Sequence, residues 1–169
     1  MQIRIAKTED LPAIMALYEQ AKRYMKQTGN PTQWAGAYPQ PERVRADMEK
    51  GQCHVCVENG RIEGVFTLIF GEEPTYRVIE QGAWPDEKPY ATLHRLASSG
   101  RVPRVSDACF SYAKARFDRL RVDTHRDNGA MQRLAERMGY TRCGIIPIRG
   151  TAEDGALRYA YEKPLIDIK

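Results

Sequence analysis

The chain has 169 residues and a net charge of +4, and these figures limit what it can be. Hydrophobic residues make up 42% and charged residues 28%, which is typical of one globular domain with a core. Basic residues are scattered along the chain, which argues against a nucleic-acid partner. No stretch reaches the ~18 apolar residues of a membrane span, and the N-terminus lacks the apolar core of a signal peptide. We therefore expect a cytoplasmic protein with no membrane partner.

The first 70 residues show helical spacing twice and one hairpin signal. Thr8 is placed to cap a helix, because threonine is a favoured N-cap and an apolar run with helical spacing follows it. Asn59 and Gly60 favour a two-residue turn between strands. The predicted elements are a strand at 3–6, a helix from Thr8 to about Met25, a helix at 41–50 and a hairpin at 52–70.

Strands and helices alternate over the rest of the chain. Residues 71–89 form a polar and aromatic stretch, and loops longer than ~12–15 residues are uncommon unless they serve a function. The later predicted elements are strands at 90–97 and 119–125, helices at 104–118 and 128–138, and two final strands at 141–148 and 156–165 around a loop at 149–155. This order predicts a single α/β domain over residues 1–169.

Four cysteines are present, and two of them form a C-x-x-C pair that could indicate zinc or redox chemistry. Cys53 and Cys56 fall in the predicted hairpin, where residues three apart point to opposite faces of a strand. Cys109 and Cys143 are solitary in apolar surroundings. We therefore predict that the cysteines pack in the core and that no metal is bound.

The segment "SSGRVPRVSD" has the composition of an anion site at a strand-to-helix junction. Pro103 is suited to the first helical position, which would leave the amides of Arg104, Val105 and Ser106 facing outward beside two guanidinium groups. The alternative is a capped helix with solvated arginines. It is not a P-loop, because no Gly-Lys-Ser/Thr follows.

Downstream, "LRVDTHRDNGAMQRLAERMGYTRCGII" combines a strand, an Asn-led helix, a Gly-aromatic step and another strand. With the preceding loop, this resembles the GNAT acyltransferase superfamily over essentially the full chain. The resemblance implies an α/β fold with a mixed (α+β), mostly antiparallel central sheet, splayed at the acyl-CoA site and flanked by about four helices. It also implies an acetyl-CoA-dependent N-acetyltransferase, with acetyl-CoA as cosubstrate and no metal.

The resemblance also indicates which residues hold CoA. The loop from Arg101 to Ser106 would cradle the pyrophosphate, with Arg104 where the family usually has glycine. Asn128 would contact the pantetheine arm, or cap its helix, or do both. A backbone amide near Leu96 would stabilise the developing oxyanion. The predicted CoA-binding residues are Leu96, Ala97, Arg101, Val102, Arg104, Val105, Ser106, Asn128 and Met131.

A general base is needed, because an amine is mostly protonated at neutral pH. Many relatives carry an acidic base on the strand before the loop, but "YATLHRLASS" contains no carboxylate. His94 shares the face of the matching position and is the first candidate, although it could instead be paired within the sheet. Glu80 in the long loop and His125 are the others. Ala135 stands where relatives carry a tyrosine as general acid, and Tyr140 is expected to pack in the core.

The acceptor side is expected to come from the variable segments. Trp34, Tyr38, Tyr76 and Trp84 are aromatic residues on irregular stretches, which we read as exposed and therefore as acceptor contacts, lids over the core or a dimer contact. The expected reaction moves an acetyl group to a primary amine, on a small molecule or a peptide N-terminus, by a monomer or homodimer. The alternative function is a non-catalytic acyl-CoA-binding or sensory domain.

Overall fold

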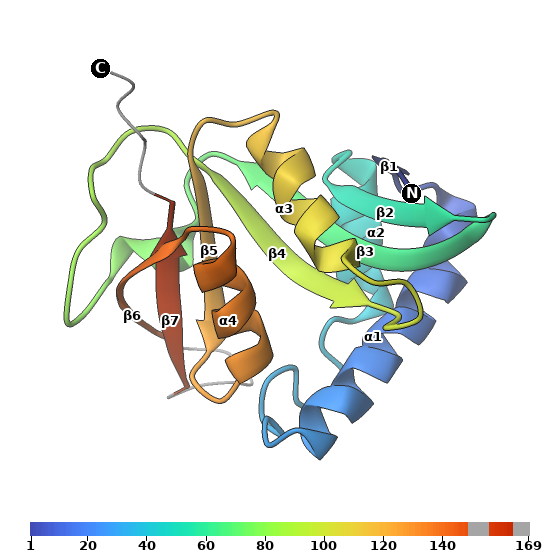
Figure 1. Cartoon of the computed structure of the whole chain (residues 1–169), viewed down its shortest axis with the longest axis horizontal. Coiled ribbons are helices and arrows are strands. Elements are labelled where there is room, and N and C mark those ends of the chain that lie inside the picture. Colours follow the sequence, from blue (N-terminus) through green and yellow to red (C-terminus); the bar gives the residue numbers. More distant parts are fainter. Residues whose placement is uncertain (149–155, 164–169) are drawn as a thin grey trace.

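The computed structural model describes residues 1–148 and 156–163 and arranges them as a mixed sheet between helices (Figure 1). The strands are β1 (Gln2–Ile5), β2 (Cys53–Glu58), β3 (Arg61–Phe70), β4 (Ala91–Ser98), β5 (Leu120–His125), β6 (Thr141–Pro147) and β7 (Leu157–Glu162). The helices are α1 (Leu11–Gln27), α2 (Pro41–Glu49), α3 (Val105–Lys114) and α4 (Gly129–Arg137), with 3-10 turns η1 (Thr8–Asp10) and η2 (Pro74–Arg77). The predicted fold class is confirmed. The predicted loop at 149–155 and the end of the last predicted strand lie outside the described residues.

The sheet is divided at its one parallel pair. The strand order is β1-β2-β3-β4-β5-β7-β6, and β4 and β5 run parallel while the other neighbours are antiparallel. The parallel pair is bonded only where Ala91 meets Leu120 and Thr92 meets Arg121, and beyond this point the strands diverge (Figure 1). The later part of β4, as far as Ser98, therefore turns an edge of peptide groups toward the gap, free of any described strand on that side.

Helices cover both faces of the sheet, so each face has its own core. The α3 and α4 helices pack on one face, and α1 and α2 pack on the other (Figure 1). Neighbouring strand residues point to opposite faces, and accordingly Val65 of β3 lies in the α1/α2 core while Phe66 lies in the α3/α4 core. Each fully buried side chain of this size stabilises the fold by roughly 1.5–3 kcal/mol.

The predicted hairpin is confirmed between β2 and β3. Asn59 has φ 49° and Gly60 has φ 74°, which are the left-handed conformations that a type I′ turn requires. The predicted cap at Thr8 is wrong, because α1 begins only at Leu11 and the turn η1 precedes it. Asp10 does not cap α1 with its side chain either; its carboxylate instead accepts a hydrogen bond of 2.7 Å from the Lys7 amide, which closes the turn η1.

A bulge in β4 determines which side chains enter the site. Thr67 of β3 pairs with His94 and Val65 pairs with Ala97, so Arg95 and Leu96 together face one residue of β3. Arg95 adopts a left-handed conformation with φ 52°. As a result, His94 and Arg95 both reach groups on the α1/α2 side of the sheet, where Arg95 NH2 lies 2.8 Å from Asp47 Oδ2 of α2.

Candidate active site

The gap between β4 and β5 opens into a cavity of about 380 Å³. Its walls come from the free edge of β4, the start of α3, the first turns of α4 and the second half of α1. Five of the predicted CoA-binding residues line it, namely Leu96, Ala97, Ser106, Asn128 and Met131. The other lining residues are Gln20, Ala21, Tyr24, Met25, Ser98, Ser99, Gly100, Ala130 and Leu134. The cavity therefore runs from the start of α3 along the edge of β4.

The helix start at one end of this cavity differs from the prediction. α3 begins at Val105, so the prediction that Pro103 is the first helical residue is wrong. Arg104 precedes the helix in a left-handed conformation with φ 60°, which only glycine adopts without strain. The amides of the first turn have no acceptor within the helix, which makes them available to an anion. Gly64 of β3 allows close packing here, because a Cβ would collide with Val105.

Glu63 of β3 anchors the loop before α3. Its carboxylate accepts a hydrogen bond from Ser99 Oγ and lies 2.9 Å from Arg101 NH2. The Ser99 hydrogen bond lowers the pKa of Glu63; burial opposes this and Arg101 adds to it. Ser99 Oγ in turn accepts the Arg101 amide at 3.1 Å. The loop is thus fastened to the sheet at its first residues.

Asn128 has the capping role that was one of its two predicted functions. Its Oδ1 accepts a hydrogen bond from the Met131 amide at 3.0 Å at the start of α4. Its Nδ2 donates to Gln33 Oε1 at 2.9 Å, and Gln33 Oε1 also accepts from Asn30 Nδ2. The segment between α1 and α2 is thereby held against the start of α4, next to the cavity.

A second, smaller cavity of about 70 Å³ adjoins the first on the α1/α2 side of the sheet. Its lining includes Trp34, Tyr38, His94, Arg95, Asp123 and Arg158. The two cavities share four lining residues, which are Met25, Leu96, Asn128 and Met131. A reactive group placed among these four residues is reachable from both cavities.

His94 stands in the second cavity between two carboxylates. Its Nε2 lies 3.0 Å from Glu73 Oε2, and its Nδ1 lies 3.6 Å from Asp123 Oδ1. The side chain of Asp123 is 4% exposed and also accepts hydrogen bonds from Tyr76 Oη at 2.6 Å and from Arg158 NH1 at 2.8 Å. Burial acts to raise the pKa of Asp123, but the charges of Arg158 and His94 and the Tyr76 hydrogen bond lower it. His94 was predicted from the sequence, but neither carboxylate was.

The other two candidate bases lie elsewhere. Glu80 is exposed, lines neither cavity, and pairs through its backbone with Ile145 of β6. His125 is buried at the end of β5, where its Nε2 lies 3.3 Å from Thr32 Oγ1 and its Nδ1 accepts the Asp127 amide at 3.2 Å. Of these three residues, only His94 lines one of the two cavities, the second.

The four aromatic residues separate into two pairs. Trp34 and Tyr38 line the second cavity, and Tyr38 Oη accepts a hydrogen bond of 3.2 Å from Arg95 NH1. Tyr76 and Trp84 instead line a third concavity, whose walls come mostly from the 71–89 segment itself. Trp84 Nε1 donates a hydrogen bond to the Tyr76 carbonyl at 3.0 Å. The expectation that these aromatics are exposed is wrong for Trp34 and Tyr76, which pack in the interior and are only 7% and 3% exposed.

Position 135 does not face the site. Ala135 is fully buried in the α3/α4 core, whereas the preceding residue, Leu134, lines the CoA-side cavity. A tyrosine at 135 would therefore overpack the core rather than reach a thiolate. Tyr140 packs in the same core with an edge-to-face contact to Phe110, as predicted.

The C-x-x-C pair is divided between the two cores, as predicted. Cys53 lies in the α1/α2 core, where burial raises its pKa to about 12, and Cys56 lies in the α3/α4 core. Cys109 is not solitary, because its Sγ lies 3.4 Å from Cys56 Sγ.

Within residues 1–148 and 156–163, His, Cys, Asp and Glu are nowhere grouped in threes that could hold a metal ion. No helix in these ranges is long and apolar enough to cross a membrane.

Several lining residues had no signal in the sequence. Gln20, Tyr24 and Met25 belong to α1; Met25 falls in the apolar stripe with helical spacing, which indicated only a core contact, and Gln20 and Tyr24 fall outside it. Gln20 Nε2 donates to the Ser99 carbonyl at 2.5 Å, so α1 also supports the loop before α3. A sheet split beside an amide-rich helix start, with two cavities that meet at the split, is the architecture of an acyl-CoA-dependent transferase.

Comparisons with known proteins identify the family. The chain is similar to a GNAT-family acetyltransferase from Streptococcus agalactiae, with 31% identity over 96% of this chain and 94% of that one and a TM-score of 0.84. A putative acetyltransferase from Staphylococcus aureus is 26% identical over 98% and 99% of the two chains, with a TM-score of 0.67. One from Salmonella typhimurium, solved with its cofactor acetyl-CoA, has the same fold at 16% identity, 98% and 94% coverage and a TM-score of 0.61. No protein-family model and no curated protein matches the chain. The chain belongs to the GNAT family of acetyltransferases.

Proposed function

We propose that this acetyltransferase moves the acetyl group of acetyl-CoA directly to a primary amine, on a small molecule or a peptide N-terminus, within a ternary complex. The observation that carries the proposal is the junction of the two cavities at Met25, Leu96, Asn128 and Met131. A thioester carbon at this junction can be approached from the acceptor side while CoA fills the larger cavity.

The larger of the two adjoining cavities is assigned to CoA because its lining groups suit the parts of that molecule. The amides that begin α3, at Val105 and Ser106, with the charges of Arg101 and Arg104, suit a pyrophosphate. The free edge of β4 at Leu96 and Ala97 offers peptide groups to the amide-rich pantetheine arm, with Val102, Asn128 and Met131 beside it. An N–H on this edge would stabilise the oxyanion that forms at the thioester carbonyl.

The acceptor side is assigned to the second cavity. Trp34 and Tyr38 contact the acceptor there, and Tyr76 acts through its hydrogen bond to Asp123. Trp84 belongs to the 71–89 segment, lines the third concavity and reaches only the part of a long acceptor that extends beyond the second cavity.

His94 is assigned as the base, because it lines the acceptor cavity and Glu80 does not. The neutral amine nitrogen attacks the thioester carbon, a C–N bond forms, and the C–S bond then breaks. The amine proton passes to His94, and CoA leaves as a thiolate, which is tolerable because a thiol titrates near pH 8.5. No side chain is required to protonate the leaving group.

The test is a screen of amines with acetyl-CoA, read by release of free thiol and corrected for reaction without amine. Alkylamines, polyamines, amino-acid amides and short peptides with a free N-terminus cover the two acceptor classes. We expect the wild type to turn over at least one amine. His94→Ala should lower the rate roughly 10²–10⁴-fold and retain the affinity for acetyl-CoA. A thermal shift with CoA and no thiol release from any amine would instead support the acyl-CoA-binding or sensory domain.

A further inference from the structure

The environment of His94 is built from three separate elements. His94 comes from β4, Glu73 from the segment before η2, and Asp123 from β5 on the other side of the split. The side chains of His94 and Glu73 are 15% and 16% exposed, and that of Asp123 is 4% exposed. The two carboxylates approach different nitrogens of the imidazole from separate elements, and this fixes the orientation of the ring.

The two distances at the ring differ in kind. The 3.0 Å between His94 Nε2 and Glu73 Oε2 is a hydrogen-bond length, whereas the 3.6 Å between Nδ1 and Asp123 Oδ1 is not. An ionised carboxylate only accepts hydrogen bonds, so Nε2 must be the nitrogen that carries the proton. The neutral ring then has its lone pair on Nδ1, on the side of Asp123, and both residues line the acceptor cavity.

Glu73 is itself held rigidly and kept ionised. Its Oε1 accepts two hydrogen bonds from Thr75, from the amide at 3.2 Å and from Oγ1 at 2.9 Å, which leaves Oε2 for His94. Its backbone amide donates to Tyr90 Oη at 3.0 Å. Burial acts to raise the pKa of Glu73, but the hydrogen bond from His94, the positive charge that His94 carries when it is protonated, and the Thr75 bonds outweigh it and lower the pKa to about 2.

Several charged and polar groups of the described residues surround the ring. Asp123 is paired with Arg158 of β7 and accepts Tyr76 Oη of η2, whose ring centroid lies 6.1 Å from that of His94. Arg95, the next residue of β4, turns away to Asp47 of α2 and to Tyr38 Oη. Among the residues that the structure describes, Glu73 and Asp123 are therefore the two carboxylates that face the ring.

We propose that Glu73 is a positioning residue that fixes the tautomer of His94 with the lone pair on Nδ1, and that Asp123 receives the N–H formed there when His94 accepts the proton of the acceptor amine. This inference rests on the proposed function. The proton leaves the amine nitrogen as the C–N bond forms and is held on Nδ1 between the ring and Asp123. The imidazolium then has an N–H toward each carboxylate, and the proton returns to solvent after the product leaves.

Glu73→Gln gives a sharp test, because Thr75 determines how the glutamine lies. The two Thr75 donors take the amide oxygen, so the amide NH₂ faces His94 Nε2 and donates to it. The ring proton must then move to Nδ1, where a lone pair is needed. We expect a loss of about 10²–10⁴-fold in kcat/KM with acetyl-CoA affinity unchanged. Glu72→Gln is the matched control, because Glu72 is exposed and pairs with Arg77 instead.

The tautomer itself is read by nitrogen NMR of ¹⁵N-histidine-labelled protein at a pH where the ring is neutral. The chain has three histidines, so His54 and His125 variants assign the His94 signals. Wild type should show a protonated Nε2 and a lone-pair Nδ1, reversed in Glu73→Gln and unchanged in Glu72→Gln. If Glu73→Gln does not fold, Glu73→Ala should show mixed tautomers and a smaller loss of activity.

The outcomes separate this inference from the proposed function. A protonated Nδ1 in resting wild type, or wild-type kcat/KM in Glu73→Gln or Glu73→Ala, overturns the role of Glu73. If wild type releases no thiol with any amine, the proposed function fails, and with it the proton transfer to His94. The NMR measurement still decides in that case whether Glu73 fixes the tautomer.

Discussion

Arg101 NH2 lies 2.9 Å from Glu63 Oε2, so the first arginine of the loop before α3 is paired with the sheet beneath it. Arg104 is exposed and has no carboxylate partner among the described residues. The two arginines are therefore not equivalent. The charge of Arg101 is partly neutralised and serves to fasten the loop, whereas that of Arg104 is available to an anionic ligand.

We expect Arg104→Ala to weaken CoA binding more than Arg101→Ala does, and the double variant to weaken it most. The loss should be larger at low salt than at high salt, because salt screens interactions between exposed charges. Calorimetric titration with CoA measures this, and Arg45→Ala on the exposed side of α2 is the control. If the double variant binds CoA with unchanged affinity, neither arginine side chain contributes, and the backbone amides alone form the anion site.

The left-handed conformation of Arg104 predicts that glycine at this position stabilises the fold, although loss of the arginine weakens CoA binding. Glycine adopts φ 60° without the steric penalty of a Cβ, which is roughly 1–2 kcal/mol. Arg104→Gly should therefore raise the free energy of unfolding by about 1 kcal/mol relative to Arg104→Ala, measured by denaturant titration without CoA. The two variants lack the same charge, so equal stabilities would show that the backbone strain is absent.

Elements with local signals could be predicted from the sequence. The hairpin follows from Asn59-Gly60, and the start of α4 follows from an asparagine before an amphipathic run. The split between β4 and β5 was anticipated only through family resemblance, because no residue pattern marks where a parallel pair stops. The start of α3 was predicted one to two residues too early, at 103–104, since proline favours a helix start but nothing in the sequence marks Arg104 as left-handed.

The partners of His94 could not be predicted, because they depend on tertiary contacts. Strand parity identified the face of His94, but Glu73 lies 21 residues earlier in a segment without periodicity. Asp123 approaches only because β5 lies parallel to β4. Likewise, an aromatic residue in a polar loop, such as Trp34, has the same sequence pattern whether it is exposed or buried, and the packing decides.

Two tyrosines, one in each of the two adjoining cavities, test which cavity binds the amine and which binds acetyl-CoA. Tyr38 lines the acceptor cavity, and Tyr24, which is 55% exposed on α1, lines the CoA-side cavity. Tyr38→Ala should raise KM for the amine and leave KM for acetyl-CoA nearly unchanged, and Tyr24→Ala should do the reverse. Steady-state kinetics with one substrate varied at a time measures both. If both variants affect only acetyl-CoA, the acceptor binds elsewhere.

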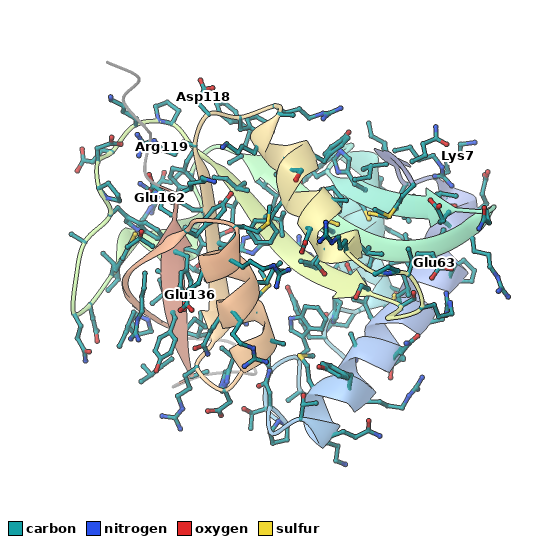
Figure 2. The ribbon with its side chains drawn as sticks, in the orientation of Figure 1. Lys7, Glu63, Asp118, Arg119, Glu136 and Glu162 are labelled. Carbon is teal, nitrogen blue, oxygen red and sulfur yellow. The ribbon has the colours of Figure 1, made fainter. Side chains whose placement is uncertain are left out.

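Glu162 is the buried centre of an ion-pair cluster at the end of β7. Its Oε1 accepts a hydrogen bond from Arg119 NH1, and both residues are labelled in Figure 2. Its Oε2 accepts one from Arg121 Nε at 2.7 Å. Removing the charge leaves the buried guanidinium of Arg121 without a carboxylate partner among the described residues, whereas Arg119 keeps its ion pair with Asp86 at 2.8 Å. Breaking a buried ion pair in this way costs about 3–5 kcal/mol. We expect Glu162→Gln to lower the unfolding free energy by this order, measured by denaturant titration. Asp118→Asn, an exposed acidic residue nearby, should change little.

The depressed pKa of Glu73 predicts how its contribution to stability depends on pH. The pKa of a free glutamate is near 4.5 and that of folded Glu73 is about 2, so the folded state favours the ionised form. The stabilisation is fully present above pH 4.5 and is lost as the pH falls toward 2. We expect wild type to exceed Glu73→Gln in unfolding free energy by on the order of 2 kcal/mol at neutral pH. That difference should shrink steadily below pH 4.5, as measured by urea titration at several pH values. The exposed Glu72→Gln control should show little pH-dependent change. A wild-type advantage that stayed constant at acid pH would mean that Glu73 is not held ionised by His94 and Thr75.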